Sequence, residues 1–141
     1  MERLRNLVTG SHGYLGEHLV RRLEQQEQEV LRGDRKGSVR AGVQYIYDLA
    51  AYGNMYEQYN VSSMYEANVQ RLLTLLFSAR EYKGLVVTST NSVILPRTSF
   101  YTASKMAAEA LAKAFVDTYD KPIVIVRPFS ITGIGEQEQH L

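Results

Sequence analysis

Two short stretches of the sequence contain residues whose types and spacing could do chemistry. In Tyr101-Thr-Ala-Ser-Lys105, a tyrosine and a lysine four residues apart lie on one face of a helix. An ammonium held beside a phenol favours the phenolate, so such a tyrosine can transfer protons near neutral pH. The second stretch, Thr9 to Gly16, is a glycine turn that offers backbone N–H groups to a phosphate. Together they indicate proton transfer beside a bound dinucleotide, which is oxidoreductase chemistry.

The glycine turn has the context that a phosphate-binding motif needs. Residues Arg3 to Thr9 end in an apolar pair and are typical of a short buried strand. After the turn, apolar residues recur at helical spacing at Leu15, Leu19, Val20 and Leu23. A glycine turn between a strand and a helix is the required arrangement, whereas the Tyr–Lys pair alone would fit a solvated helix face equally well. The glycines recur every three residues, which points to a particular branch of Rossmann proteins.

Composition excludes several classes of function. A chain of 141 residues is long enough for one domain, which buries about two-thirds of its unfolded surface. The net charge is +1 and basic residues alternate with acidic ones, so we expect no nucleic-acid partner. The sequence has no cysteine, which excludes disulfides, thiolate nucleophiles and cysteine-ligated metals. No segment resembles a signal peptide or a membrane span, and we expect a cytoplasmic protein without membrane contact and without a metal site.

Predicted strands alternate with predicted helices along the rest of the chain. The further strands are Glu29–Gly33, Val43–Leu49, Leu85–Thr88 and Ile123–Arg127, and the longer helices are Tyr65–Tyr82 and Tyr101–Tyr119. Alternation of this kind, with nearly continuous Val, Ile and Leu strands, predicts a parallel sheet covered by helices on both faces. The expected fold class is α/β, a three-layer Rossmann-like doubly wound parallel sheet of about five strands, forming one domain over residues 1–141.

The order of these motifs resembles the short-chain dehydrogenase/reductase superfamily, in particular its extended branch of nucleotide-sugar epimerases, dehydratases and reductases. The stretch Thr9–Gly16 resembles the glycine motif of that branch, and Val87–Thr90 resembles the strand that ends in a catalytic Ser or Thr. Tyr101 and Lys105 match the catalytic pair. The stretch Arg127–Gly133 resembles the segment that contacts the nicotinamide side of the cofactor. The resemblance runs nearly from end to end of the chain.

This resemblance implies an NAD site, with NADP as the alternative. Asp34 would accept hydrogen bonds from the adenosine ribose hydroxyls, or else it is a turn residue. Arg32 and Arg35 flank it and could hold a 2′-phosphate, although a carboxylate there repels phosphate and favours NAD. The implied cofactor-binding residues are Gly10, His12, Gly13, Tyr14, Leu15, Asp34, Arg35, Leu49, Ala50, Ala51, Thr88, Tyr101, Lys105 and Pro128.

The resemblance also implies catalytic roles for Thr90, Tyr101 and Lys105. Tyr101 would exchange a proton with a substrate hydroxyl while hydride moves to or from the nicotinamide. Lys105 would lower the pKa of Tyr101 and bind the nicotinamide ribose. Thr90 would orient the substrate oxygen, unless it is an ordinary residue at a strand end. The implied substrate is a nucleotide sugar or another small hydroxyl or carbonyl compound. Asn68 matches a structural asparagine of the family. We expect Asp48 to cap a strand end, with a contact at the edge of the cofactor as the alternative.

Two departures from the family pattern bear on these roles. About nine residues separate Asp34 from the strand Val43–Leu49, too few for the further strand and helix of the family. The expected strand order is therefore 2-1-3-4-5, with a crevice where the order reverses beside the first strand. We also expect the substrate domain that follows Arg127–Gly133 in the family to be missing. A module that binds NAD(P) without turnover, and a dimerising scaffold, therefore stay open beside an enzyme.

The two longer predicted helices carry apolar residues on more than one face. A helix that is apolar over most of its circumference must be covered on both sides. In the extended branch, the equivalent helices pack against their copies as a four-helix bundle. We therefore expect a two-fold homodimer through residues 65–82 and 101–119.

Overall fold

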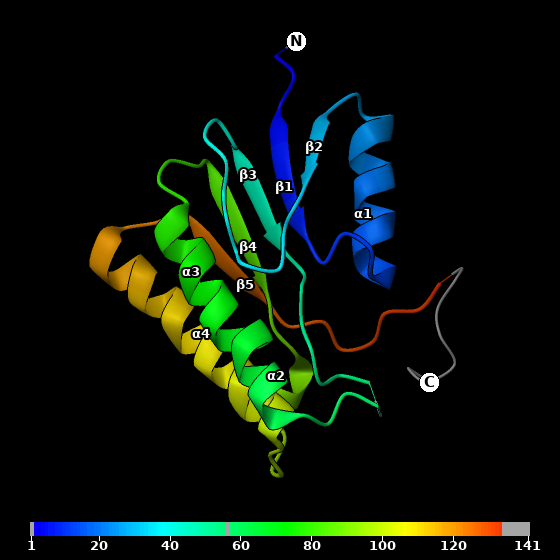
Figure 1. Cartoon of the computed structure of the whole chain (residues 1–141), viewed down its shortest axis with the longest axis vertical. Coiled ribbons are helices and arrows are strands. Elements are labelled where there is room, and N and C mark those ends of the chain that lie inside the picture. The colour runs from blue at the N-terminus through cyan, green and yellow to red at the C-terminus, as the bar shows by residue number, and fades with distance from the viewer. Residues whose placement is uncertain (1, 56, 134–141) are drawn as a thin grey trace.

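The computed structural model describes residues 2–55 and 57–133, which form a five-stranded sheet with helices on both faces (Figure 1). The strands follow the order β2-β1-β3-β4-β5, and all four pairings between neighbours in this part of the chain are parallel. Their bounds are Arg5–Thr9 for β1, Glu29–Arg32 for β2, Tyr45–Asp48 for β3, Gly84–Thr88 for β4 and Ile123–Val126 for β5. The α/β, Rossmann-like fold class and the expected strand order are confirmed.

One helix covers one face of the sheet, and two long helical segments cover the other (Figure 1). The first face carries α1 (Tyr14–Gln25), and the second carries α3 (Arg71–Ser78) and α4 (Phe100–Tyr119). Two short elements, α2 (Val61–Tyr65) and the π-helix η1 (Glu66–Gln70), lead directly into α3, and a 3-10 turn, η2 (Asn91–Ile94), follows β4. No helix among the described residues is both long and apolar enough to cross a membrane.

The helix predicted over Tyr65–Tyr82 differs from the observed one at both ends. It begins four residues earlier because the Asn60 side chain accepts a hydrogen bond from the Ser63 N–H (3.0 Å) and caps α2. It ends at Ser78, where Ala79 leaves the helical conformation (φ −77°, ψ 111°). The predicted span also did not include a π-helical turn. Periodicity of apolar residues cannot reveal one extra residue inserted in a helix.

The main core lies between the sheet and the α3–α4 layer. Strand side chains alternate between the two faces, so one set packs with α3 and α4 and the next set faces α1. The larger cluster contains Leu7, Ile46, Leu85, Val87, Leu72, Leu75, Leu76, Ala108, Ala112 and Phe115. A smaller cluster joins Val8 to Val20 and Leu23 of α1. Over β5 the α1 side is open within the described residues, because Val124 and Val126 are 58% and 39% exposed.

The start of α1 packs directly on the turn that follows β1. A Cβ placed on Gly16 would overlap the carbonyl oxygen of Gly10 and would lie 2.8 Å from the Cα of Ser11. Gly10 has a φ of +62°, and a Cβ there would lie 2.8 Å from the backbone nitrogen of Ala50. Only glycine fits both requirements at these two positions. Close backbone packing therefore explains two of the three glycines before any ligand is considered.

We predict that Gly16→Ala lowers the free energy of unfolding by about 1–3 kcal/mol, because the added methyl group must push helix and turn apart. Gly13→Ser is the matched control. Gly13 is the N-cap of α1, where serine is favoured, and an added Cβ there would meet only the Gly10 carbonyl oxygen, at 3.3 Å. Urea denaturation of both variants checks the prediction. Equal stability of Gly16→Ala and Gly13→Ser would contradict it.

Candidate cofactor-binding and catalytic site

A crevice of about 660 Å³ lies at the carboxyl ends of β1, β3 and β4. This volume is typical of small-molecule sites, and the crevice lies where the strand order reverses, which is the usual ligand position in such sheets. Eleven of the residues expected in the site line it: Gly10, Gly13, Tyr14, Leu15, Leu49, Ala51, Thr88, Thr90, Tyr101, Lys105 and Pro128. Segments far apart in the sequence therefore meet at one end of the sheet.

Four expected cofactor-binding residues do not line this crevice. Ala50 lies behind its wall, where its backbone packs against Gly10 and its N–H donates to the hydroxyl of Thr9 (3.1 Å). His12 and Arg35 are exposed, and His12 Nδ1 lies 3.7 Å from a carboxylate oxygen of Glu17. Asp34 is exposed after β2, beside the crevice rather than in its wall.

The N-terminus of α1 opens into the crevice without a side-chain cap. Gly13 is the N-cap residue, with φ −75° and ψ 171°, and no side chain accepts from the first turn. The first N–H groups of a helix have no partner inside the helix, and they carry its positive dipole end. Gly13 itself donates to the Gly10 carbonyl (3.0 Å), which folds the turn tightly under the helix. This arrangement suits a phosphate or pyrophosphate group.

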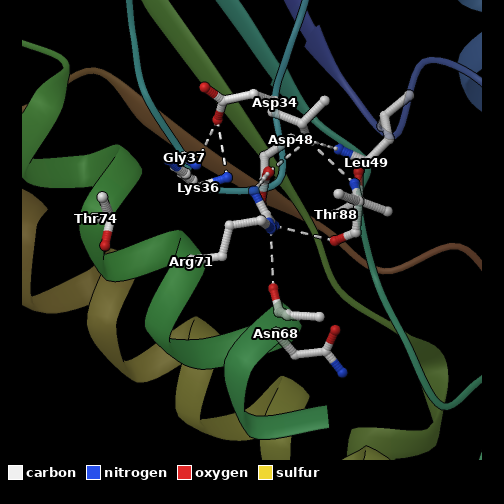
Figure 2. A network of polar contacts seen from close by, with 12 residues as sticks. Asp34, Lys36, Gly37, Asp48, Leu49, Asn68, Arg71, Thr74 and Thr88 are labelled. Carbon is white, nitrogen blue, oxygen red and sulfur yellow. Dashed lines mark hydrogen bonds and ion pairs between the residues drawn. The ribbon is translucent and has the colours of Figure 1, made fainter. Parts of the chain in front are cut away.

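Asp34 organises the turn after β2. Its Oδ1 accepts hydrogen bonds from the backbone N–H groups of Lys36 (2.9 Å) and Gly37 (2.9 Å) (Figure 2), and from that of Ser38 (3.2 Å). The bond from Ser38 is the main cause that lowers the pKa of the Asp34 carboxyl, so the group is a carboxylate at neutral pH. The alternative reading of Asp34 as a turn residue is thus correct, and its contact with a ribose stays a prediction.

Arg32 is engaged with the glycine turn. Its Nη1 donates to the Ser11 carbonyl (2.9 Å) and lies 3.4 Å from Glu17 Oε1. The sequence suggested that Arg32 could hold a 2′-phosphate, and it did not indicate these bonds. They orient the guanidinium along the turn and support the backbone that faces the crevice.

Asp48 is not a strand cap, and this expectation was wrong. Its carboxylate is buried and pairs with Arg71 of α3, with Nη1 and Oδ1 2.8 Å apart (Figure 2). Sequence reasoning missed Arg71 altogether. The only available signal was an acidic residue at the end of a buried strand, and nothing in the spacing connects positions 48 and 71.

Asn68 is the structural asparagine that the sequence predicted. Its Oδ1 accepts from the Tyr52 N–H (2.8 Å), and its Nδ2 donates to the Tyr52 carbonyl (2.7 Å) and to Ser104 Oγ (2.9 Å). The residue lies in the π-helix η1, where an inserted residue reorients the side chains of a helix. Asn68 therefore ties the loop after β3 to Ser104 of α4, the residue immediately before Lys105.

Tyr101, Lys105 and Thr90 come together from α4 and the end of β4. Ser99 caps α4 through the Thr102 N–H (3.1 Å), which fixes the first turn that carries Tyr101. Lys105 Nζ donates to the Thr88 carbonyl (2.6 Å). The Thr90 hydroxyl oxygen accepts from the Ser92 N–H (3.2 Å) and caps η2. Within the described residues, no hydrogen bond reaches the Tyr101 hydroxyl.

Burial is the largest cause of the pKa shifts of Tyr101 and Lys105. It raises the pKa of Tyr101 above the usual phenol value. It lowers the pKa of Lys105, which is 5% exposed, while Asp48 and Glu109 act in the opposite direction. The expected lowering of the Tyr101 pKa by Lys105 is therefore absent from this structure, where the ammonium is directed to the Thr88 carbonyl. At neutral pH, Tyr101 is a protonated phenol that can donate.

The segment after β5 closes one side of the crevice. Residues 128–131 line it, and the chain then passes below the sheet toward the start of α1 (Figure 1). A Cβ placed on Gly133 would overlap the hydroxyl of Tyr14, so the two segments are in close contact. Residues 128–131 of the segment Arg127–Gly133 thus border the crevice, and contact of this segment with a nicotinamide stays a prediction.

Fold and site together define a dinucleotide-type Rossmann protein with a tyrosine and a lysine at its crevice. The chain belongs to the NAD dependent epimerase/dehydratase family, whose model matches residues 6–44 and 38–141. No curated protein matches the sequence.

Several solved structures share the fold. MoeE5 in complex with UDP-glucose and NAD is 26% identical, with a TM-score of 0.79 over 94% of this chain and 56% of that one. DesIV, a dTDP-glucose 4,6-dehydratase from Streptomyces venezuelae with NAD and TYD bound, is 24% identical, with a TM-score of 0.76 over 88% of this chain and 55% of its own. UDP-glucuronic acid 4-epimerase from Bacillus cereus, in complex with UDP-glucuronic acid and NAD, is 19% identical. Its TM-score is 0.78 over 92% of this chain and 58% of that one. The chain thus spans just over half the length of these proteins.

The raised pKa of Tyr101 predicts how stability depends on alkaline pH. In the unfolded chain a tyrosine ionises near pH 10, whereas the folded chain holds the Tyr101 proton to higher pH. Above about pH 10 the unfolded state therefore binds fewer protons, and the free energy of unfolding falls as pH rises. Tyr101→Phe removes this contribution, so its stability should fall less steeply as pH rises above about 10.

Urea denaturation across this pH range is the measurement, and Tyr59→Phe is the control, because Tyr59 is 81% exposed in the loop before α2. We expect Tyr59→Phe to follow the wild-type curve. A Tyr101→Phe curve parallel to wild type would show that burial does not hold the proton on Tyr101.

Proposed function

We propose that the chain is an NAD-binding domain of a nucleotide-sugar epimerase, dehydratase or reductase, with Thr90, Tyr101 and Lys105 as its catalytic residues. The observation that carries the proposal is one crevice that contains both an uncapped helix N-terminus and the Tyr101–Lys105 pair. Membership of the NAD dependent epimerase/dehydratase family supports it. So do the NAD molecules named for the similar structures.

The residues of the crevice fit a dinucleotide. Gly10 and Gly13 leave the N-terminus of α1 open to a pyrophosphate, and a side chain at position 13 would enter that space. Leu49 and Ala51 would border the adenosine side, and Asp34 would bind its ribose. NAD supplies hydride acceptance or donation at its nicotinamide. Because Asp34 is a carboxylate at neutral pH, it would repel a 2′-phosphate and favour NAD over NADP.

The catalytic residues would hold and move one proton. Tyr101 is protonated at neutral pH and would donate to a substrate oxygen, or accept a proton once positive charge beside it favours the phenolate. The Thr90 oxygen already accepts from Ser92, so its own proton is directed elsewhere and would bond to the same substrate oxygen. Lys105 is buried and would hold its ammonium against a ribose hydroxyl of the cofactor as well as the Thr88 carbonyl.

Nucleotide sugars are the proposed substrates, because the similar structures are named with UDP-glucose and UDP-glucuronic acid. A module that binds NAD without turnover is the second candidate. It is favoured by the open side of the crevice, where Phe129 is 73% exposed, since an exposed site neither excludes water nor holds a substrate firmly. Incubation with NAD and UDP-glucose or UDP-glucuronic acid, followed by separation of the nucleotide sugars, distinguishes the two candidates. Epimerisation and dehydration return the hydride to the sugar, so a new sugar product rather than accumulated NADH is the sign of turnover.

Titration with NADH is the direct test of cofactor binding. We predict a micromolar to millimolar Kd, about −4 to −8 kcal/mol. Gly13→Val should abolish binding, because Gly13 lines the crevice at the N-terminus of α1 and a larger side chain there would take up space proposed for the pyrophosphate. Gly84→Ala, at the opposite end of the sheet, should bind as wild type does. Undiminished binding by a folded Gly13→Val variant would refute the assignment of this turn.

We also propose a two-fold homodimer through the outer helices. Large apolar residues are exposed there at Tyr65 of α2, Phe77 of α3, and Met106 and Tyr119 of α4. Burying such residues against a second copy removes apolar surface from water. We predict a dimer by sedimentation at high micromolar concentration, weakened by Phe77→Lys. A wild-type monomer under those conditions would contradict the proposal.

A further inference from the structure

A buried ion pair lies directly behind the wall of the crevice. Asp48, at the end of β3, is 3% exposed, and Arg71, at the start of α3, is 6% exposed. The guanidinium of Arg71 binds the carboxylate of Asp48 in a bidentate arrangement, with Nη1 2.8 Å from Oδ1 and Nη2 3.2 Å from Oδ2 (Figure 2). Neither side chain lines the crevice. The catalytic and cofactor-binding roles proposed above do not use them.

The carboxylate fixes the orientation of a hydroxyl at the end of β1. Thr9 Oγ1 accepts hydrogen bonds from the backbone N–H groups of Leu49 (3.0 Å) and Ala50 (3.1 Å). Its own proton is therefore directed to Asp48 Oδ1, which lies 2.6 Å away. Because the acceptor is ionised, this is a strong, short hydrogen bond. Asp48 thus holds Thr9, and Thr9 holds the backbone that borders the crevice.

Arg71 holds the same backbone from the other side. Its Nη2 donates to the Ala50 carbonyl (3.1 Å), and its Nε donates to the Ala67 carbonyl in η1 (2.9 Å). Both backbone groups of Ala50 are therefore fixed, the N–H by Thr9 and the carbonyl by Arg71. Gly10 also packs against Ala50. A Cβ added to Gly10 would lie 2.8 Å from the backbone nitrogen of Ala50. The distance between two walls of the crevice depends on this residue.

We propose that Asp48 and Arg71 are positioning residues, which set the separation of the Leu49–Ala51 segment from the glycine turn and so determine cofactor affinity. This inference rests on the proposed function. Stability alone does not account for the pair, because replacing a buried ion pair with apolar residues of similar volume is often neutral or stabilising. A role in positioning predicts that such a replacement leaves the fold intact and still loses affinity.

The two charges must be changed together. Asp48 raises the pKa of Lys105 and Arg71 lowers it, so the two charges of the pair act on Lys105 in opposite directions. Removing one member alone would leave an unpaired buried charge and also shift Lys105. Double variants avoid both effects and isolate the geometry.

The experiment compares two double variants. Asp48→Leu with Arg71→Met removes every hydrogen bond of the pair. Asp48→Asn with Arg71→Gln keeps an acceptor for Thr9 and, because glutamine reaches as far as Arg71 Nε, a donor for the Ala67 carbonyl without charge. We expect the apolar double variant to bind NADH at least tenfold more weakly than wild type. The polar double variant should lose less affinity than the apolar one, because the Thr9 hydroxyl that holds Leu49 and Ala50 keeps its acceptor.

Two controls separate positioning from general effects. Val43→Ala creates a cavity in the core before β3, away from the crevice, and should lower stability with unchanged NADH affinity. Lys113→Met with Asp117→Leu removes an exposed ion pair of α4 and should change neither stability nor affinity appreciably.

Amide hydrogen exchange gives a readout that needs no cofactor. The Leu49 and Ala50 amides should exchange at least tenfold faster in the apolar double variant than in wild type, while core amides of β4 keep their rates. If the apolar variant does not fold, Arg71→Lys replaces it. Lysine keeps the positive charge but lacks the planar guanidinium group. The exchange rates of the Leu49 and Ala50 amides and the NADH Kd should therefore both increase several-fold.

A folded apolar double variant with wild-type NADH affinity and wild-type exchange at Leu49 and Ala50 would overturn the inference and leave the proposed function standing. Wild-type protein that does not bind NADH would overturn the proposed function. In that case the exchange rates still decide whether the pair positions this backbone.

Discussion

The geometry of the whole site depends on a close approach of backbone to backbone at the end of β1. Gly10 touches Ala50 on one side, and the Gly10 carbonyl touches Gly16 on the other, with no room for a Cβ at either position. These contacts hold the N-terminus of α1 at the end of β1, beside the loop after β3. The N-terminus of α1, the loop after β3 and the first turn of α4 therefore border one crevice.

The side chains around that crevice are held by polar bonds between elements. Asn68 ties the loop after β3 to α4, Arg32 supports the glycine turn, and the Asp48–Arg71 pair holds Ala50. Such bonds contribute modestly to net stability, but a buried donor or acceptor left without its partner is costly. Their main effect is to restrict the backbone to one arrangement. This restriction is what an active site requires, since small displacements of reacting groups cost large factors in rate.

Local patterns predicted the parts of the structure that depend on neighbours in sequence. Runs of Val, Ile and Leu gave the strands, glycine spacing gave the turn before α1, and the Tyr101–Lys105 spacing gave two side chains on one helix face. The ion pair between Asp48 and Arg71 and the bond from Arg32 to Ser11 join residues 23 and 21 positions apart. No local rule relates such positions, so only the folded chain shows them.

Electrostatic expectations failed for a related reason. The sequence places Lys105 one helical turn from Tyr101, which suggests a lowered phenol pKa. In the fold, however, the ammonium bonds to Thr88, and burial dominates both groups. Desolvation depends on every element that covers a residue, and helical spacing carries no information about it. A lowered pKa of Tyr101 would therefore require positive charge brought by what binds in the crevice.

In the proposed complex, NAD lies across the crevice, with its pyrophosphate at the α1 N-terminus and its nicotinamide beside Tyr101. A crystal structure of the chain grown with NAD would show this arrangement. We expect density for the pyrophosphate over Gly10 and Gly13 and for the nicotinamide ring between Tyr101 and the segment that begins at Pro128. NAD bound elsewhere on the protein, or bound with the nicotinamide away from Tyr101, would contradict it.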